Sequence, residues 1–298
     1  MIWTQWSDLK IPSGLAHLPT DGVTPRAEDL EKITFYVPAY MYGAAALAPI
    51  AHMSSLQVIQ SPNAGVDDVI PLRPKGVTLC NAAGVHDAST AELAVGLAIA
   101  ARRGFAEFSQ NQSKGIWLHT SNAALTDSKV AIVGHGNIGK TIARMLAGFE
   151  VQITSFSKSG SDGALTMDQF DKEISNFDVI ILIVPLNDQT RHLMNSKRLA
   201  AMKDGAALVN VARGGIVAED ELVALINSGH LAGATLDVFA TEPLPAESPL
   251  WQNEKIVVTP HVAAQPSVEP VVEQFLENLR RLEEGETLIN EVDRQLGY

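Results

Sequence analysis

The chain has 298 residues, a net charge of −12 and 46% hydrophobic residues. This length predicts two domains, each able to bury its own core, and the composition excludes a disordered or fibrous chain. The acidic balance and the absence of any extended Lys or Arg run argue against a nucleic-acid partner, because affinity for a phosphate backbone depends on clustered cations that release counterions.

The cysteine content and the hydropathy of the chain bear on the cellular compartment in which the protein is expected. Cys80 is the only cysteine, which excludes an internal disulfide and a multi-cysteine zinc site. No apolar stretch reaches the ~20 residues of a membrane span, and the N-terminus does not match a secretory signal. We therefore expect a cytoplasmic protein with no membrane partner. We also expect no metal, since no histidine pair has metal-ligand spacing with supporting carboxylates.

The first part of the chain predicts parallel βα units. Three prolines interrupt the first thirty residues, which allow no assignment: Pro12, Pro19 and Pro25. Beyond them, short apolar runs alternate with helical patterns, as in parallel βα units. We expect strands within 33–38, 56–62 and 77–82, and a helix over 44–52.

A long helix is predicted over 88–105. Asp87 is suited to its N-cap, and Arg102, Arg103 and Gly104 are suited to its C-terminus. The polar segment 108–128 that follows is long for a loop inside a compact domain. We expect it to be irregular and to pack at a subunit interface or a domain boundary.

A second α/β series starts at Lys129. Its apolar runs are nearly continuous in Val, Ile and Leu, which is typical of strands covered on both faces. A doubly wound parallel sheet is therefore predicted, with strands within 129–134, 151–156, 177–185, 206–212, 231–238 and 255–260 and helices over 138–146, 166–174, 196–202 and 219–228. A last helix, 269–284, is expected to return to the first domain. The expected domains are 1–87 with 267–298, and 88–266.

A glycine motif lies between a predicted strand and a predicted helix. It is a GxGxxG sequence formed by Gly134, His135, Gly136, Asn137, Ile138 and Gly139. The first glycine permits a tight turn, the second lets a pyrophosphate approach the backbone, and the third allows close packing of helix and strand. The helix N-terminus offers N–H groups to the phosphates. This context predicts a Rossmann-type dinucleotide-binding domain.

The end of the next strand indicates which dinucleotide binds. An NAD site carries an Asp or Glu about 20 residues after the motif, where it holds the ribose hydroxyls. Here that place is taken by Ser157, Lys158 and Ser159, which could hydrogen-bond a 2′-phosphate and neutralise part of its charge. We predict NADP(H) as the preferred cofactor, with NAD(H) possible. The alternative is that these are solvated loop residues and that Asp162 serves as the acid.

Three ionisable residues follow late strands of the predicted sheet, where ligands bind in open α/β folds: Arg213, Glu242 and His261. Each alone has an ordinary structural explanation, but together they form a candidate catalytic set. At this point the chain resembles the D-isomer-specific 2-hydroxyacid dehydrogenase family, through five ordered motifs: VGHGNIGK, VPLNDQTRHLM, LVNVARGG, LDVFATEPLP and VVTPHVA. The likeness runs from about Ile59 to the end of the terminal helix.

The resemblance implies an enzyme whose cofactor domain is inserted into a smaller flavodoxin-like substrate domain. It implies an Arg, Glu and His catalytic set and a homodimer. It makes Ala64 and Gly65 the residues whose N–H groups meet the substrate carboxylate. It also implies that Asp237 orients the nicotinamide carboxamide, and that further residues lie beside the cofactor: Pro185, Thr190, Val211 and His261.

The residues support this chemistry. Reduction of a 2-keto acid requires a hydride at C2, a proton for the carbonyl oxygen and a cation for the carboxylate. Arg213 would bind the carboxylate and polarise the carbonyl. His261 would act as acid/base, with Glu242 orienting its ring.

The favoured function is NAD(P)H-dependent reduction of a small 2-keto acid, with glyoxylate and hydroxypyruvate as expected substrates, because the loop SPNAGVDD adds no cation for a phosphate. One alternative is a D-3-phosphoglycerate or D-lactate type dehydrogenase, and a phosphorylated substrate would need a further basic group such as Arg73 or Lys75. Another alternative is a nicotinamide-sensing corepressor, which the fold does not exclude.

Overall fold

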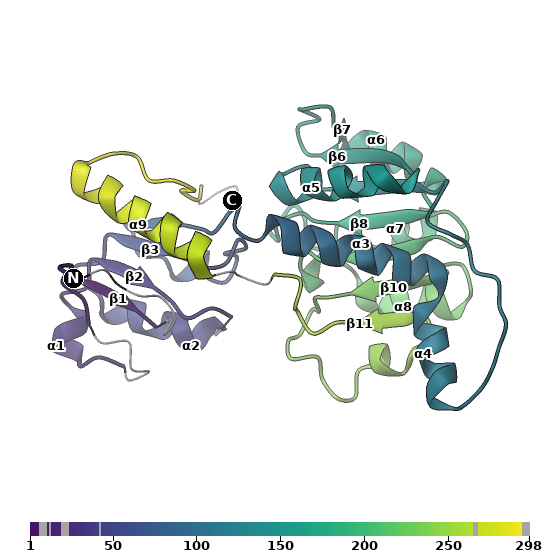
Figure 1. Cartoon of the computed structure of the whole chain (residues 1–298), viewed down its shortest axis with the longest axis horizontal. Helices are drawn as coiled ribbons and strands as arrows, with labels where there is room; N and C mark the ends of the chain where they lie inside the picture. Colours follow the sequence, from purple (N-terminus) through teal and green to yellow (C-terminus); the bar gives the residue numbers. More distant parts are fainter. Residues whose placement is uncertain (6–10, 12, 19–23, 42, 265–267, 294–298) are drawn as a thin grey trace. The chain divides into compact units, whose positions relative to one another are not determined.

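The computed structural model divides the chain into two compact units, each with its own parallel sheet (Figure 1). One unit is Met1–His86 with Pro266–Tyr298, and the other is Asp87–Gln265. The structure describes residues 1–5, 11, 13–18, 24–41, 43–264 and 268–293, so Pro12 and Pro19 lie outside the described residues. The predicted fold class is confirmed: a doubly wound α/β domain inserted into a smaller α/β domain.

The smaller unit has a four-stranded sheet in the order β1-β2-β3-β4, with parallel neighbours. The C-terminal helix covers it, and the ring of Phe275 lies edge-on to that of Phe35 with their centroids 5.4 Å apart. The elements are β1 (Ile2–Thr4), α1 (Ala27–Leu30), β2 (Phe35–Val37), α2 (Gly43–Leu47), β3 (Val58–Gln60), β4 (Thr78–Cys80) and α9 (Val268–Glu284).

The helix predicted over 44–52 is shorter than expected. The α-helical part ends at Leu47, and Ala48–His52 forms a 3₁₀ helix. Pro49 explains this change, because it has no N–H to donate and its ring clashes with the carbonyl four residues earlier in an α-helix.

The larger unit has a seven-stranded parallel sheet in the order β11-β10-β9-β8-β5-β6-β7. The chain builds outward from β5 through β6 and β7, then returns to β8 on the other side of β5. Ligands of such sheets bind at the carboxyl ends of the strands beside this reversal. The strands are β5 (Lys129–Val133), β6 (Gln152–Ser157), β7 (Leu165–Thr166), β8 (Val179–Leu182), β9 (Ala207–Asn210), β10 (Gly233–Leu236) and β11 (Ile256–Val258).

Both faces of this larger sheet are covered. In β8, Ile180 and Leu182 lie in one apolar core, and Val179 and Ile181 lie in another, which is shared with α3 and α5. Alternate residues of a strand face opposite sides, so a strand buried on both sides is apolar throughout. The helices are α3 (Asp87–Arg103), α4 (Phe105–Ser113), α5 (Asn137–Leu146), α6 (Met167–Glu173), α7 (Ser196–Ala201) and α8 (Glu219–Asn227).

The prediction that 108–128 is irregular was wrong for its first residues. Gly104 adopts a left-handed conformation (φ 69°), which ends α3, and α4 starts at the next residue. The polar sequence hides this helix, but it contains no Gly or Pro to stop helical hydrogen bonding, and the N–H of Phe108 donates to the carbonyl of Gly104.

Candidate active site

The glycine motif forms a tight turn between β5 and α5. Gly134 has a positive φ of 120°, and a Cβ at this position would lie 2.2 Å from the carbonyl oxygen of Ile183. A Cβ on Gly139 would lie 2.1 Å from the carbonyl oxygen of Gly134. Both positions therefore require glycine, as the motif predicts.

The start of α5 is suited to binding a phosphate. Among the described residues, no side chain caps this helix at Gly136, and an added Cβ there would meet no atom within 4 Å. The helix N-terminus, with Asn137, Ile138 and Gly139 in its first turn, thus has open space beside it and N–H groups without a capping side chain. These residues fit the pyrophosphate of a dinucleotide.

The loop after β6 carries the residues expected to select the cofactor. Ser157 ends the strand, and its hydroxyl accepts a hydrogen bond from the N–H of Gly160 at 3.1 Å. The hydroxyls of Ser159 and Ser161 are 2.7 Å apart. Lys158 lies between the two serines and is exposed. A cation and hydroxyls thus lie where an NAD site carries an acid.

Asp162, the alternative acid, is engaged elsewhere. Its carboxylate forms an ion pair with Lys140 of α5 at 2.9 Å. The hydrogen bond and the charge of Lys140 lower the pKa of Asp162. The carbonyl of Asp162 is also 3.1 Å from a ring nitrogen of His135. The loop therefore lies beside the glycine motif, with its acid neutralised by a lysine.

Glu242 and His261 form a direct pair at the carboxyl edge of the sheet. The Nδ1 of His261 lies 2.6 Å from one carboxylate oxygen of Glu242, and the N–H of Phe239 donates to the other at 2.8 Å. Because a carboxylate only accepts, Nδ1 carries the proton, which leaves Nε2 for proton exchange with a ligand. Both side chains are partly exposed, at 25% and 33% for His261 and Glu242.

The environment keeps Glu242 ionised. Burial acts to raise its pKa, but the hydrogen bonds from His261 and Phe239 and the charges of His261 and Arg213 outweigh burial, so the pKa of Glu242 lies below its usual value. Glu242 is thus a carboxylate at neutral pH and accepts the hydrogen bond from the His261 ring.

Arg213 follows β9 and is fixed by its own loop. Its backbone carbonyl accepts from the side chain of Asn210 at 3.0 Å, and one guanidinium nitrogen donates to the carbonyl of Ala212 at 2.8 Å. A Cβ on Gly214 would overlap the backbone of Phe239, so glycine is required for the Arg213 loop to lie against the segment that leads to Glu242. Arg213, Glu242 and His261 are therefore brought together.

Asn210 is a residue of this site that the sequence reasoning missed. Its side chain also accepts from the N–H of Ala212, and it is 1% exposed. A polar residue at the end of an otherwise apolar buried strand was the available signal.

Asp237 holds the segment that carries His261. Its buried carboxylate accepts from the Thr259 hydroxyl at 2.6 Å and from the N–H groups of Val262 and Ala263 at 3.0 Å. Its carbonyl accepts from the N–H of His261, which has a left-handed φ of 53°. Residues other than glycine rarely adopt this conformation, and the hydrogen bonds to Asp237 hold the His261 backbone in it. Contact of Asp237 with a nicotinamide carboxamide remains a prediction.

Two further predicted cofactor residues meet after β8. The hydroxyl of Thr190 donates to the carbonyl of Pro185 at 2.6 Å, which closes the intervening loop. Val211 is buried just after β9.

Ala64 and Gly65 belong to the other unit, where the carbonyl of Ala64 accepts from the side chain of Asn81 at 2.9 Å.

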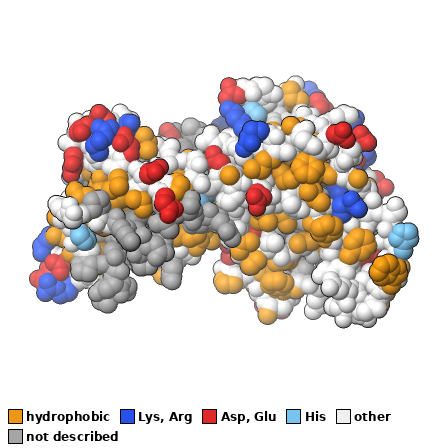
Figure 2. Space-filling model, viewed as in Figure 1, with side chains coloured by type: hydrophobic (Ala, Val, Ile, Leu, Met, Phe, Trp, Pro, Cys, Tyr) orange, Lys and Arg blue, Asp and Glu red, His pale blue; other side chains and the backbone are white. Residues whose placement is uncertain are grey.

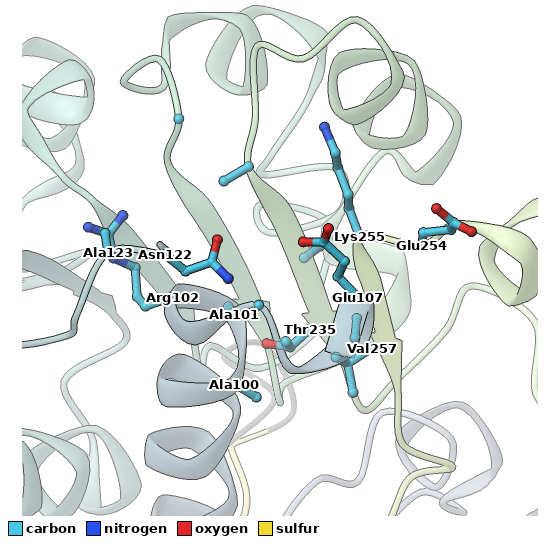
Figure 3. Close-up of a pocket in the computed structure, with 15 residues that line it drawn as sticks. Ala100, Ala101, Arg102, Glu107, Asn122, Ala123, Thr235, Glu254, Lys255 and Val257 are labelled. Carbon is cyan, nitrogen blue, oxygen red and sulfur yellow. The ribbon is translucent and has the colours of Figure 1, made fainter. Parts of the chain in front are cut away.

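A cavity of about 250 Å³ lies in the larger unit but does not coincide with these residues (Figure 3). Arg102, Glu107, Asn122 and Lys255 are among the residues that line it. It reaches the residues that precede β9, β10 and β11, whereas Arg213, Glu242 and His261 follow the carboxyl ends of these strands. It is therefore a separate feature.

Among the residues that the structure describes, no group of three or more His, Cys, Asp or Glu side chains could hold a metal ion. Within the same residues, no helix is long and apolar enough to cross a bilayer.

Comparison with known proteins identifies relatives over the whole chain. Residues 95–263 match the family model described as D-isomer specific 2-hydroxyacid dehydrogenase, NAD binding domain. A protein of Corynebacterium melassecola, described only as an uncharacterized protein in the proB 3′ region, is 33% identical over 297 residues, covering 92% of each chain.

Solved structures agree with that match. A D-isomer specific 2-hydroxyacid dehydrogenase from Xanthobacter autotrophicus Py2, in complex with NADPH and MES, is 28% identical, covers 100% of this chain and 99% of its own, and has a TM-score of 0.84. An NADPH-dependent glyoxylate/hydroxypyruvate reductase from Sinorhizobium meliloti, in complex with NADP and sulfate, is also 28% identical, covers 90% of this chain and 87% of its own, and has a TM-score of 0.80.

Proposed function

Because the chain belongs to the D-isomer specific 2-hydroxyacid dehydrogenase family, we propose that it reduces a small 2-keto acid to the D-2-hydroxy acid with NADPH. The observation that carries this proposal is the 2.6 Å pair between His261 and Glu242, next to Arg213 at the carboxyl edge of the larger sheet. The three side chains supply an acid, its orienting carboxylate and a cation for a keto acid.

In this mechanism, Arg213 binds the substrate carboxylate and polarises the C2 carbonyl with its fork of N–H donors. The N–H groups of Ala64 and Gly65 bind the same carboxylate. Nε2 of His261 gives its proton to the C2 oxygen, and Glu242 stabilises the ring through Nδ1. A nicotinamide held by the residues named below would supply the hydride for C2. For oxidation of the D-2-hydroxy acid, neutral His261 takes the proton back.

The dinucleotide is held by the glycine motif and by residues of three neighbouring loops. The proposed contacts are Gly134, Gly136, Asn137, Ile138, Gly139, Ser157, Lys158, Ser159, Pro185, Thr190, Val211, Asp237 and His261. Ser157, Lys158 and Ser159 support NADPH over NADH, since a cation and hydroxyls favour a 2′-phosphate. Solved relatives bind NADPH or NADP.

Glyoxylate and hydroxypyruvate are the proposed substrates. The loop of Ala64 and Gly65 contains no Lys or Arg for a substrate phosphate, and Arg73 of the same unit donates to the carbonyl of Val292. The relative from Sinorhizobium meliloti is named for these two substrates.

A buried thiol at Cys80, without a disulfide, supports a reducing compartment such as the cytoplasm.

We also propose a homodimer formed through the larger unit. Several large apolar side chains on and after α4 are exposed, and Trp117 is 96% exposed. Figure 2 shows hydrophobic side chains on the visible face of this unit. Several large apolar side chains exposed in one segment are typical of an interface. The other exposed large apolar residues of this segment are Phe105, Phe108, Ile116 and Leu118. Light scattering on the purified chain tests this proposal.

Loss of reduced-nicotinamide absorbance tests the reaction. We expect turnover with glyoxylate or hydroxypyruvate, faster with NADPH than with NADH, and weaker turnover with pyruvate and 3-phosphohydroxypyruvate. A preference for 3-phosphohydroxypyruvate would replace the substrate proposal. If the protein bound the cofactor but reduced none of these acids, the enzyme proposal would fail in favour of a sensor.

Replacement of Lys158 with Ala tests the cofactor site. We expect the KM for NADPH to rise about 10-fold and the KM for NADH to stay nearly constant, because the lysine pairs only with the 2′-phosphate. Lys172→Ala is the matched control, since Lys172 is an exposed lysine on α6 of the same unit. An equal rise for both cofactors in Lys158→Ala would contradict this role.

A further inference from the structure

The loop that carries Ala64 and Gly65 is held by one short segment of the same unit, residues 81–86. Three successive loop carbonyls accept hydrogen bonds from it. The carbonyl of Pro62 accepts from Nε2 of His86 at 2.9 Å, that of Asn63 from the N–H of Ala82 at 3.0 Å, and that of Ala64 from the side chain of Asn81 at 2.9 Å. The segment thus fixes the direction of three consecutive peptide groups.

Because each peptide group is planar, the hydrogen bonds to the carbonyls also fix the directions in which the neighbouring N–H groups point. In a planar trans peptide, the N–H points away from the preceding C=O. Since the carbonyls of Asn63 and Ala64 face the segment 81–86, the N–H groups of Ala64 and Gly65 face away from it. Within the described part of the chain, neither N–H has a hydrogen-bond partner. Two adjacent donors are therefore available to an anion.

Asn81 is the side chain that holds the second of these peptides. Its Nδ2 donates to Ala64 while its Oδ1 accepts from the N–H of Ala83 at 3.1 Å, so both ends of the amide are fixed. Asn81 is 7% exposed. Its backbone N–H donates to the carbonyl of Asn290 at 3.0 Å, which ties it to the C-terminal part of the unit.

A chain of hydrogen-bonded, buried amide side chains supports Asn81. The Nε2 of Gln60 donates to the Asn81 carbonyl at 3.3 Å, and the Oε1 of Gln60 accepts from Asn278 of α9 at 2.7 Å. Gln60 and Asn278 are both fully buried. When every polar atom of such a buried network has a hydrogen-bond partner, the network stabilises one arrangement of its side chains.

We propose that Asn81 is a positioning residue, which orients the Ala64–Gly65 peptide so that the Gly65 N–H is presented to the carboxylate of the 2-keto acid. This inference rests on the proposed function, in which Ala64 and Gly65 bind that carboxylate. His86 acts in the same way one step earlier in the loop, through the carbonyl of Pro62. The sequence offered no sign of this role, since Asn81 lies outside the loop itself.

Asn81→Asp tests the proposal with an almost isosteric side chain. The change replaces the donor Nδ2 with an oxygen that repels the Ala64 carbonyl, whereas Oδ1 can still accept from Ala83. We expect the KM for glyoxylate to rise about 10-fold, because a lost hydrogen bond to a charged group is worth roughly that factor. We expect kcat and the KM for NADPH to change less than about 2-fold, because the carboxylate contact is made equally in the ground and transition states.

Gln274→Glu is the matched control. Gln274 donates to the carbonyl of Ala83 at 2.8 Å, so this variant makes the same amide-to-acid change against the same segment without touching the loop. We expect it to retain the wild-type KM for glyoxylate even where its melting temperature falls as far as that of Asn81→Asp. If Asn81→Asp does not fold, Asn81→Ala removes the donor without the repulsion and should give the same rise in KM.

Each outcome decides a separate point. A wild-type KM for glyoxylate in folded Asn81→Asp or Asn81→Ala overturns the positioning role, as does an equal rise in the KM for NADPH or in the Gln274→Glu control. These results leave the proposed function intact, because wild-type turnover is measured first. Absence of turnover in the wild-type protein overturns the proposed function, and this inference falls with it.

Discussion

Replacement of His261 with Gln should lower kcat for 2-keto acid reduction by about 10²-fold or more, because it removes the group that gives a proton to the C2 oxygen. Gln can still donate hydrogen bonds, so the loss reports on proton transfer rather than on packing alone. The affinity for NADPH should change little, since His261 is one of many proposed cofactor contacts and the glycine motif and the loop after β6 are untouched. Steady-state kinetics and fluorescence titration with NADPH measure the two effects separately.

His230→Gln provides a matched control for this prediction. His230 lies in the same unit, its Nδ1 is 3.5 Å from a carboxylate oxygen of Asp204, and its side chain is 28% exposed, against 25% for His261. It precedes β10 and so lies at the amino end of that strand. The control should keep wild-type kcat. If His261→Gln also kept it, His261 would not be the acid.

Replacement of Arg213 with Gln should lower kcat/KM for the keto acid by about 10³-fold, because the substrate carboxylate loses two charge-assisted hydrogen bonds and the carbonyl loses its polarising cation. Most of the effect should appear in KM, with a smaller part in kcat. NADPH binding should be preserved. Kinetics over a wide range of glyoxylate concentrations resolve the two parameters.

Arg198→Gln tests whether removal of any arginine from this unit has the same effect. Arg198 of α7 pairs with Asp171 through two nitrogens at 2.6 and 3.0 Å and has no role in the proposed mechanism. This control should lose some stability but keep its kcat/KM. A comparable loss of kcat/KM in both variants would indicate a general structural effect and contradict the role given to Arg213.

The sequence predicted the dinucleotide domain because its signals are local. Gly134 and Gly139 are required by backbone contacts within a single strand–turn–helix unit, so their spacing is visible in the sequence. The near-continuous apolar runs likewise predicted a sheet covered on both faces. The helix α4 was missed because its sequence is polar and only the left-handed Gly104 separates it from α3.

The chemical groups of the site could be read from the sequence: an Arg, a Glu and a His after late strands, and a cation with hydroxyls in place of an acid after β6. Which atoms of these groups meet depends on the three-dimensional fold. Glu242 and His261 are paired through Nδ1, and Asp237 fixes the His261 backbone, because parallel strands bring their carboxyl ends to one edge. The orientation of the Ala64 and Gly65 N–H groups likewise depends on Asn81, which follows the neighbouring strand β4. Such contacts join residues distant in sequence, so no local pattern records them.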